Sequence, residues 1–145
     1  GILHDCTKYY ELPEQLDICE EYGVRLDALD QKSVKLLHSK TGACIARGVF
    51  GQPDAVYDAI FWHTTGKADM TTLEKVLYIA DYMEPNRDFD GVERLRHLDY
   101  TDLEKAMLLG VEMTIQEMQQ RQVPIHTNTL QARDWLRQHG VTTED

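Results

Sequence analysis

The chain has 145 residues, of which 42% are hydrophobic, and this length and composition suit one compact domain with a buried core. Its 15 basic and 25 acidic residues give a formal net charge of −10 at pH 7. That charge argues against a general nucleic-acid groove, which needs a basic surface to displace counterions. A small polyanion is not excluded, because a few local cations or a bound metal can dominate one pocket.

The cysteines Cys6, Cys19 and Cys44 are widely spaced and form no CxxC pair. They predict reduced thiols in a cytoplasmic protein rather than a disulfide framework or a zinc ribbon. No apolar stretch approaches the roughly 18 residues of a membrane helix, and no signal peptide is visible. Because the first residue is not methionine, we expect the numbering to start inside a longer natural chain.

Apolar spacing predicts a first helix from about Pro13 to Tyr22, with Gly23 as its stop and with Leu16 and Cys19 on the inner side. A second helix is predicted to start at Asp30 and to carry Val34, Leu37 and His38. Gly42 and Gly48 make it uncertain from the sequence whether this helix continues through them.

Pro53 is predicted to open a third helix that carries Val56, Ile60 and His63 on one stripe until the TTGK turn. Thr71 and Glu74 have the spacing of a capping box, and the helix after them places Leu73, Leu77, Ala80 and Asp81 on one side before Pro85 breaks it.

The pair Thr101 and Glu104 repeats the capping-box spacing and is predicted to open the longest helix, which Pro124 ends. A last helix carries Trp135 and Leu136 and stops at Gly140. No segment shows the apolar alternation of a strand, so the expected fold is all-α, an irregular helical bundle.

Ligand-type side chains recur on the inner sides of these helices. His38 and His63 lie beside apolar residues, Asp81 lies at the inner edge of its helix, and His4 and Asp5 are adjacent. Taken singly, each histidine has a simpler interpretation as a hydrogen-bonded core residue, and Asp81 as a cap or salt-bridge partner. Jointly they favour a metal site, because helix bundles build such sites from residues that project inward.

The segments ILHDCTK, LLHSKTGA, FWHTTG and IADYMEPNR, in this order, resemble the HD-domain metal-dependent phosphohydrolases. More narrowly, they resemble the YqeK-type branch, the bacterial symmetrical bis(5'-nucleosyl)-tetraphosphatases, and the match continues to IHTNTLQARDWL near the end of the chain. The resemblance implies a single HD domain over residues 1–145 and hydrolysis of diadenosine tetraphosphate to two ADP.

The resemblance also implies a metal site. Family members hold iron with an early histidine, the His-Asp pair and a later aspartate, which here gives His4, Asp5 and Asp81. The early histidine would lie before Gly1, so we expect a domain truncated at its N-terminus, an incomplete site and weak activity. Histidine and aspartate also suit manganese, zinc or magnesium.

Further residues are expected to bind the phosphates or to take part in catalysis. Lys8 points the same way as His4 if the first residues are helical. Either His38 or His63 is expected to protonate the leaving phosphate, and both stay open. Arg87 suits a phosphate through its planar fork. The predicted nucleotide site also includes Asp5, Cys6, Thr64 and Asp81.

The loop of His126, Thr127, Asn128 and Thr129 precedes the last helix and gathers donors where an anion or ribose can sit. The resemblance implies contacts from this loop to bound ADP, although Thr127 replaces the proline usual in the family. The simpler alternative is that Asn128 or Thr129 caps the last helix.

Two other functions fit the same residues. One is an HD phosphohydrolase that acts on another nucleotide phosphoester, and the other is a catalytically impaired module that binds a nucleotide or a metal. The expected partner is a small dinucleoside polyphosphate or ADP, with no nucleic acid and no membrane, and a homodimer stays open.

Overall fold

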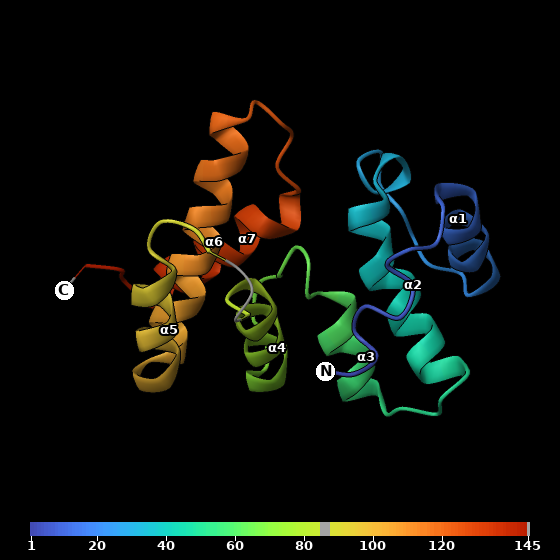
Figure 1. The fold of residues 1–145 in the computed structure, drawn as a ribbon, viewed down its shortest axis with the longest axis horizontal. Helices are drawn as coiled ribbons and strands as arrows, with labels where there is room; N and C mark the ends of the chain where they lie inside the picture. The colour runs from blue at the N-terminus through green and yellow to red at the C-terminus, as the bar shows by residue number, and fades with distance from the viewer. Residues whose placement is uncertain (85–87, 145) are drawn as a thin grey trace. The chain divides into compact units, whose positions relative to one another are not determined.

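The computed structural model describes residues 1–84 and 88–144, with side chains for all of these except residues 99 and 100. All regular structure in this part of the chain is helical, which confirms the predicted all-α fold (Figure 1). None of the described helices is long and apolar enough to cross a membrane. The chain divides into two compact units, Gly1–Thr64 and Thr65–Asp145. The single domain over residues 1–145 stays a prediction.

The first unit contains α1 (Leu12–Glu21), a 3-10 turn (Asp30–Lys32), α2 (Val34–Gly48) and α3 (Asp54–Phe61). Helix α2 packs against both α1 and α3 (Figure 1). The predicted start of α2 at Asp30 is wrong, because the Ser33 side chain caps the helix by accepting from the Leu36 amide at 3.2 Å. Helix α2 continues through Gly42 to Gly48.

The second unit contains α4 (Thr72–Tyr82), α5 (Val92–Thr101), α6 (Leu103–Gln120) and α7 (Thr127–Gln138). Helix α6 contacts α4, α5 and α7, so it forms the centre of this unit (Figure 1). A Cβ atom placed on Gly110 would lie 3.0 Å from Cδ1 of Ile79, so the glycine allows α4 to pack closely on α6. The buried core of this unit includes Tyr78, Ile79, Leu95, Met107, Leu108 and Val111.

The start of α4 confirms the predicted capping box, because the Glu74 amide donates to the Thr71 hydroxyl at 3.2 Å and the Thr71 amide donates to Glu74 Oε1 at 2.7 Å. The predicted apolar side of this helix is wrong. Leu73 is 45% exposed and Ala80 is also exposed, whereas Tyr78 and Ile79 are buried. The core side is set by packing on α6 rather than by the leucine spacing.

The start of α6 differs from the prediction. Thr101 is the last residue of α5, and the Asp102 side chain caps α6 by accepting from the Lys105 amide at 3.0 Å. Helix α5 was not predicted, and α6 ends at Gln120 before Pro124 is reached. Pro85, the predicted break after α4, lies outside the described residues.

Candidate metal and phosphate site

The segment that carries His4 and Asp5 is a series of turns before α1. The amides of Cys6, Lys8 and Tyr10 donate to the carbonyls three residues earlier, at 3.2, 3.1 and 3.1 Å. The prediction that Lys8 points the same way as His4 assumed a helix here, and these residues form turns instead. Lys8 nevertheless pairs with Asp5, because the turn brings its Nζ to 3.8 Å from Oδ2 of the carboxylate.

Two buried histidines of the first unit face this segment. His38 lies within α2, and His63 lies two residues beyond the end of α3, so the predicted helical stripe does not reach His63. Nδ1 of His63 donates to the Ile60 carbonyl at 2.6 Å, and this bond fixes the orientation of the ring. Both side chains are almost fully buried, with 6% exposure for His38 and 3% for His63.

Asp5 is the centre of the cluster, and its two oxygens face different partners. Oδ1 lies 3.1 Å from Nε2 of His38 and 3.5 Å from Nε2 of His63. Oδ2 lies 3.3 Å from Nε2 of His4 and faces the ammonium group of Lys8. The structure thus brings together His4, Asp5, Lys8, His38 and His63, all predicted site residues.

The arrangement of these donors fits a cation. Because Nδ1 of His63 carries the proton that it donates to Ile60, Nε2 of a neutral His63 holds a lone pair, which lies 3.2 Å from Nε2 of His38. A single proton on Nε2 of His38 cannot make a full hydrogen bond both to Nε2 of His63 and to Oδ1 of Asp5. The ligand atoms of Asp5, His38 and His63 all lie within 4.8 Å of one another. Imidazole and carboxylate donors at this spacing suit iron, manganese or zinc.

A second observation marks His38 as unusual. Among the described residues, its buried Nδ1 has no hydrogen-bond partner. An unpaired polar atom in a buried site is costly in a structural histidine. His38 is therefore hydrogen-bonded through Nε2 alone, and its Nδ1 is left without a partner among the described residues.

Two further predicted residues lie in the first unit. The Thr64 hydroxyl is 3.0 Å from the Ser39 hydroxyl of α2, which holds Thr64 beside His63. The Cys6 thiol contacts the Gly42 carbonyl at 3.9 Å, and partial burial raises the pKa of this thiol. Cys6 therefore stays a neutral thiol near pH 7.

The remaining predicted residues belong to the second unit. Asp81 lies in the last turn of α4 and is half-buried, and Arg87 lies outside the described residues. His126 caps α7 through Nδ1, which accepts from the Asn128 amide at 3.1 Å. The alternative that Asn128 or Thr129 caps this helix is therefore wrong. The Thr129 hydroxyl donates to the Thr65 carbonyl at 2.8 Å and ties α7 to the loop before α4.

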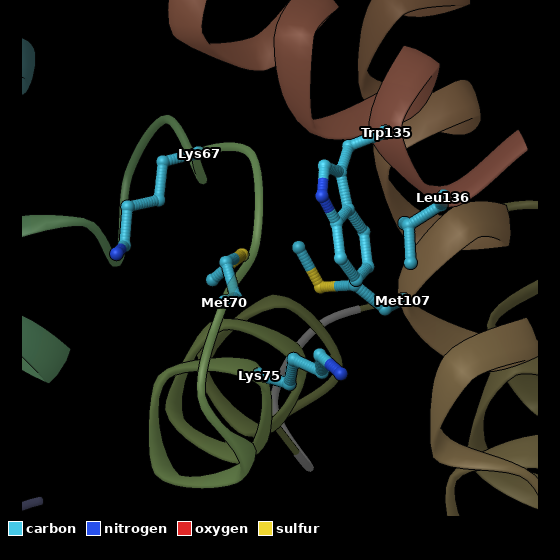
Figure 2. Close-up of a pocket in the computed structure, with 6 residues that line it drawn as sticks. All are labelled: Lys67, Met70, Lys75, Met107, Trp135 and Leu136. Carbon is cyan, nitrogen blue, oxygen red and sulfur yellow. The ribbon is translucent and has the colours of Figure 1, made fainter. Parts of the chain in front are cut away.

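A narrow pocket in the second unit is not arranged to bind an anion. It is lined by Lys67, Met70, Lys75, Met107, Trp135 and Leu136 (Figure 2). The two lysine side chains extend in different directions (Figure 2). Lys75 pairs with Glu104, and the Lys67 ammonium lies 3.6 Å from Glu74 Oε2.

Sequence reasoning missed three buried polar residues next to the cluster, Thr7, Gln15 and Thr41, and the close approach at Gly42. A signal was available for Gln15. It lies four positions before Cys19, and this spacing places both side chains on the same side of α1. A glutamine on a buried helix face needs hydrogen-bond partners.

Known proteins are similar to this chain in sequence and in fold. The family model described as the HD domain matches residues 1–86. A Bacillus subtilis protein named "Bis(5'-nucleosyl)-tetraphosphatase, symmetrical" is 35% identical over 137 residues, 94% of this chain and 73% of its own length. A Halalkalibacterium halodurans protein of the same name is 38% identical over 90% of this chain and 70% of its own length.

A solved structure from Clostridium acetobutylicum, described as a "predicted HD superfamily hydrolase involved in NAD metabolism", superimposes with a TM-score of 0.91. The two sequences are 38% identical, and the match covers 96% of this chain and 74% of the Clostridium acetobutylicum chain. This chain belongs to the HD-domain family, in the group of relatives named symmetrical bis(5'-nucleosyl)-tetraphosphatase. The resemblance inferred from the motifs is thereby confirmed, and hydrolases of this family depend on a metal.

Proposed function

We propose that this chain hydrolyses dinucleoside polyphosphates, above all diadenosine tetraphosphate, at the centre of the phosphate bridge to give two ADP. The observation that carries the proposal is the Asp5 carboxylate surrounded by three imidazoles and the Lys8 ammonium. Such a cluster holds a metal and attracts phosphate at the same place. The names of the relatives support the choice of substrate.

The metal, with iron as the choice that the family favours, is assigned to His4 and Asp5 together with Asp81. All three side chains are half-buried, so each is shielded from bulk water while still accessible to a ligand. When bound, the metal activates a water molecule for attack on phosphorus and offsets the charge of the phosphates.

Lys8 is assigned to the phosphate bridge. Its side chain is 48% exposed, so it can turn from Asp5 toward an incoming polyphosphate without losing a buried contact. Thr64 offers a hydroxyl next to His63, and Arg87 is assigned to the phosphates because its planar fork can bind two oxygens at once. Together these groups hold the central phosphorus atoms still and neutralise negative charge as it builds on the leaving ADP.

His38 and His63 are the two candidates for the proton donor to the leaving ADP. Each presents Nε2 to the Asp5 side of the cluster, at 3.1 and 3.5 Å from Oδ1. In this scheme the proton moves from imidazole Nε2 to the phosphate oxygen released when the central P–O bond breaks.

The start of α7 is assigned to the nucleoside. Thr127 is exposed and Asn128 is half-buried at the first turn of this helix, where backbone amides attract an anion. His126 and Thr129 act as supports, because they cap the helix and tie it to Thr65. We assign the protein to the cytoplasm, since its three cysteines are free thiols.

Product analysis tests the proposal. Diadenosine tetraphosphate is incubated with the iron- or manganese-loaded chain, and nucleotides are separated by ion-exchange chromatography. ADP as the sole product supports the assignment, whereas equal amounts of AMP and ATP refute it. Replacement of the exposed His97 by glutamine serves as the control for histidine substitutions in the cluster, because His97 lies on the solvent side of α5.

The same experiment separates the two alternatives. A loaded chain that leaves diadenosine tetraphosphate intact but cleaves a nucleoside monophosphate or a cyclic dinucleotide is a hydrolase with another substrate. A loaded chain that binds ADP in calorimetry and cleaves none of these nucleotides is a binding module.

A further inference from the structure

A ring of buried hydrogen bonds joins three segments of the first unit beside the cluster. The Gln15 side-chain amide of α1 donates to the Thr7 carbonyl at 2.8 Å. The Thr41 hydroxyl of α2 donates to Gln15 Oε1 at 2.5 Å, and the Thr7 and Thr41 hydroxyls lie 2.7 Å apart. Gln15 and Thr41 are 0% exposed and Thr7 is 1% exposed, so water does not compete for these bonds.

Each hydroxyl of this ring has one proton to donate. The proton of Thr41 is donated to Gln15 Oε1, and that of Thr7 is shared between the Thr41 hydroxyl at 2.7 Å and the His38 carbonyl at 3.0 Å. Gln15 donates one amide proton to the Thr7 backbone carbonyl. The second amide proton of Gln15 points to the Tyr10 carbonyl at 3.4 Å, which leaves no polar atom of this side chain unused.

The ring lies directly next to the two groups that meet in the cluster. Thr7 is two residues after Asp5, and Thr41 is one helical turn after His38. The Thr7 hydroxyl also lies 3.0 Å from the His38 carbonyl, so the turn segment is held on α2 at the level of that histidine.

Gly42 shows how closely the turn segment approaches α2. A Cβ atom at this position would lie 3.3 Å from the His4 carbonyl oxygen and 3.5 Å from the Thr7 hydroxyl. The backbone of His4 thus packs on the helix where a side chain would stand. The hydrogen-bonded ring and the glycine are independent features that fix the same segment.

We propose that Gln15 is a positioning residue for the hydrolysis assigned above: acting through Thr7 and Thr41, it sets the position of the Asp5 carboxylate against His38. Gln15 does not face the cluster and touches neither metal nor substrate. Its effect reaches the site because the turn that carries Asp5 is bonded to Gln15 by its backbone. The inference rests on the proposed function for its kinetic readout but not for its binding readout.

The test compares Gln15→Met, which keeps the side-chain length and removes the ring, with two variants of Thr41. Thr41→Val removes the hydroxyl, and Thr41→Ser keeps it. We expect Gln15→Met and Thr41→Val each to lower kcat and to weaken Mn²⁺ binding by about tenfold, the effect of losing a group that orients a metal ligand. Thr41→Ser is expected to retain both values, and KM is expected to change little in all three.

The variant Cys19→Ala distinguishes a positioning role of Gln15 from a purely structural one. Cys19 is 1% exposed on the same side of α1 and makes no bond of the ring, so this variant lowers the unfolding temperature without touching the ring. The double variant Gln15→Met/Thr41→Val is expected to be no worse than either single variant, because both break the same ring. The imidazole chemical shifts of His38 are expected to move in Gln15→Met and not in Cys19→Ala.

The inference would be overturned if Gln15→Met kept the Mn²⁺ affinity and kcat of the wild type. Its only change would then be a lower unfolding temperature, as in Cys19→Ala. If Gln15→Met does not fold, the difference between Thr41→Val and Thr41→Ser decides. If the wild-type chain releases no ADP, the proposed function fails, while the Mn²⁺ titration and the His38 shifts still test the role of Gln15.

Discussion

The Asp5 carboxylate lies against the imidazole of His38, with Oδ1 at 3.1 Å from Nε2. One residue comes from a turn and the other from the middle of α2, 33 positions later. This contact joins two of the three segments of the first unit that carry the ligand-type side chains of the cluster, the third being the turn after α3 with His63. Because Asp5 also faces His4, Lys8 and His63, we expect it to be the most sensitive single position in the cluster.

Replacement of Asp5 by asparagine removes the charge that faces His4, Lys8 and two buried imidazoles. We expect kcat to fall by at least about 100-fold and the metal content to drop, since even groups that only orient ligands change affinity by 10- to 100-fold. Steady-state kinetics and metal analysis of the purified variant check this. A fully loaded and active Asp5→Asn protein would refute the role of the carboxylate.

Replacement of His38 or His63 by glutamine distinguishes the two candidate proton donors. The variant that lacks the donor is expected to lose about 10²- to 10⁴-fold in kcat and the alkaline limb of its pH–rate profile. The other variant is expected to retain that limb. Two profiles that both match the His97→Gln control would show that neither imidazole transfers the proton.

Substitution of Gly42 by alanine tests the close approach of the turn segment to α2. Alanine favours the helix by about 1 kcal/mol, but its Cβ displaces the His4 carbonyl, which lies 3.3 Å away. We therefore expect an unfolding temperature near that of the wild type together with a lower kcat. Thermal unfolding followed by circular dichroism and kinetics on the same sample measure the two effects. Equal kcat would show that the turn shifts without consequence.

Removal of the metal with a chelator is expected to abolish ADP release and to leave the helices intact. The core of the first unit is formed by packing of α1, α2 and α3, with Leu37 and Ile60 almost fully buried, and this packing needs no ligand. Circular dichroism before and after chelation checks the fold, and added Mn²⁺ or Fe²⁺ should restore turnover. Loss of helicity on chelation would make the metal part of the folded structure.

Alkaline pH is expected to destabilise the fold through buried groups that must lose a proton. Burial raises the pKa of Cys19 from 9.0 to about 11 and that of Tyr78 from 10.0 to about 12. The unfolded chain releases these protons first, so stability is full below pH 9.0 and declines as pH rises toward about 12. Urea unfolding across this range measures the decline.

Tyr78→Phe is the matched variant for the alkaline titration. It removes the tyrosine share of the pH dependence, so its stability is expected to fall less steeply above pH 10.0 than that of the wild type. The tyrosinate absorbance of the folded protein should lose one late-titrating group. Parallel curves for the two proteins would exclude Tyr78 as a contributor.

The fold class and most helix positions could be predicted from the sequence, because apolar spacing and caps such as Thr71 with Glu74 are local signals. Helix α5 was missed for a physical reason. Its start is Gly91 in the left-handed conformation, which offers no side-chain cap, and only Asp102 separates it from α6. Thr101 and Asp102 are both capping residue types, so spacing alone did not show which of them begins α6.

The chemical groups of the first unit could also be predicted, but the contacts that arrange them could not. His38 and His63 were found because imidazole side chains on apolar faces are unusual, and His4 and Asp5 because they are adjacent residues of ligand type. Gly42 has no such signature, and the spacing of Gln15 to Cys19 indicates burial but not its partners, since the roles of both residues depend on which segment packs on α2. That packing joins residues far apart in the chain and has no local pattern.

The backbone hydrogen bonds within residues 1–10 are local, each joining an amide to the carbonyl three residues earlier. What the segment cannot supply is its placement, which depends on the bare backbone of Gly42 and on the side chains of Gln15 and Thr41. A His-Asp dipeptide transferred to another helical protein would therefore bring the donor atoms without the geometry. The dipeptide alone is therefore weak evidence of a site, because the surrounding structure is needed to arrange its donor atoms.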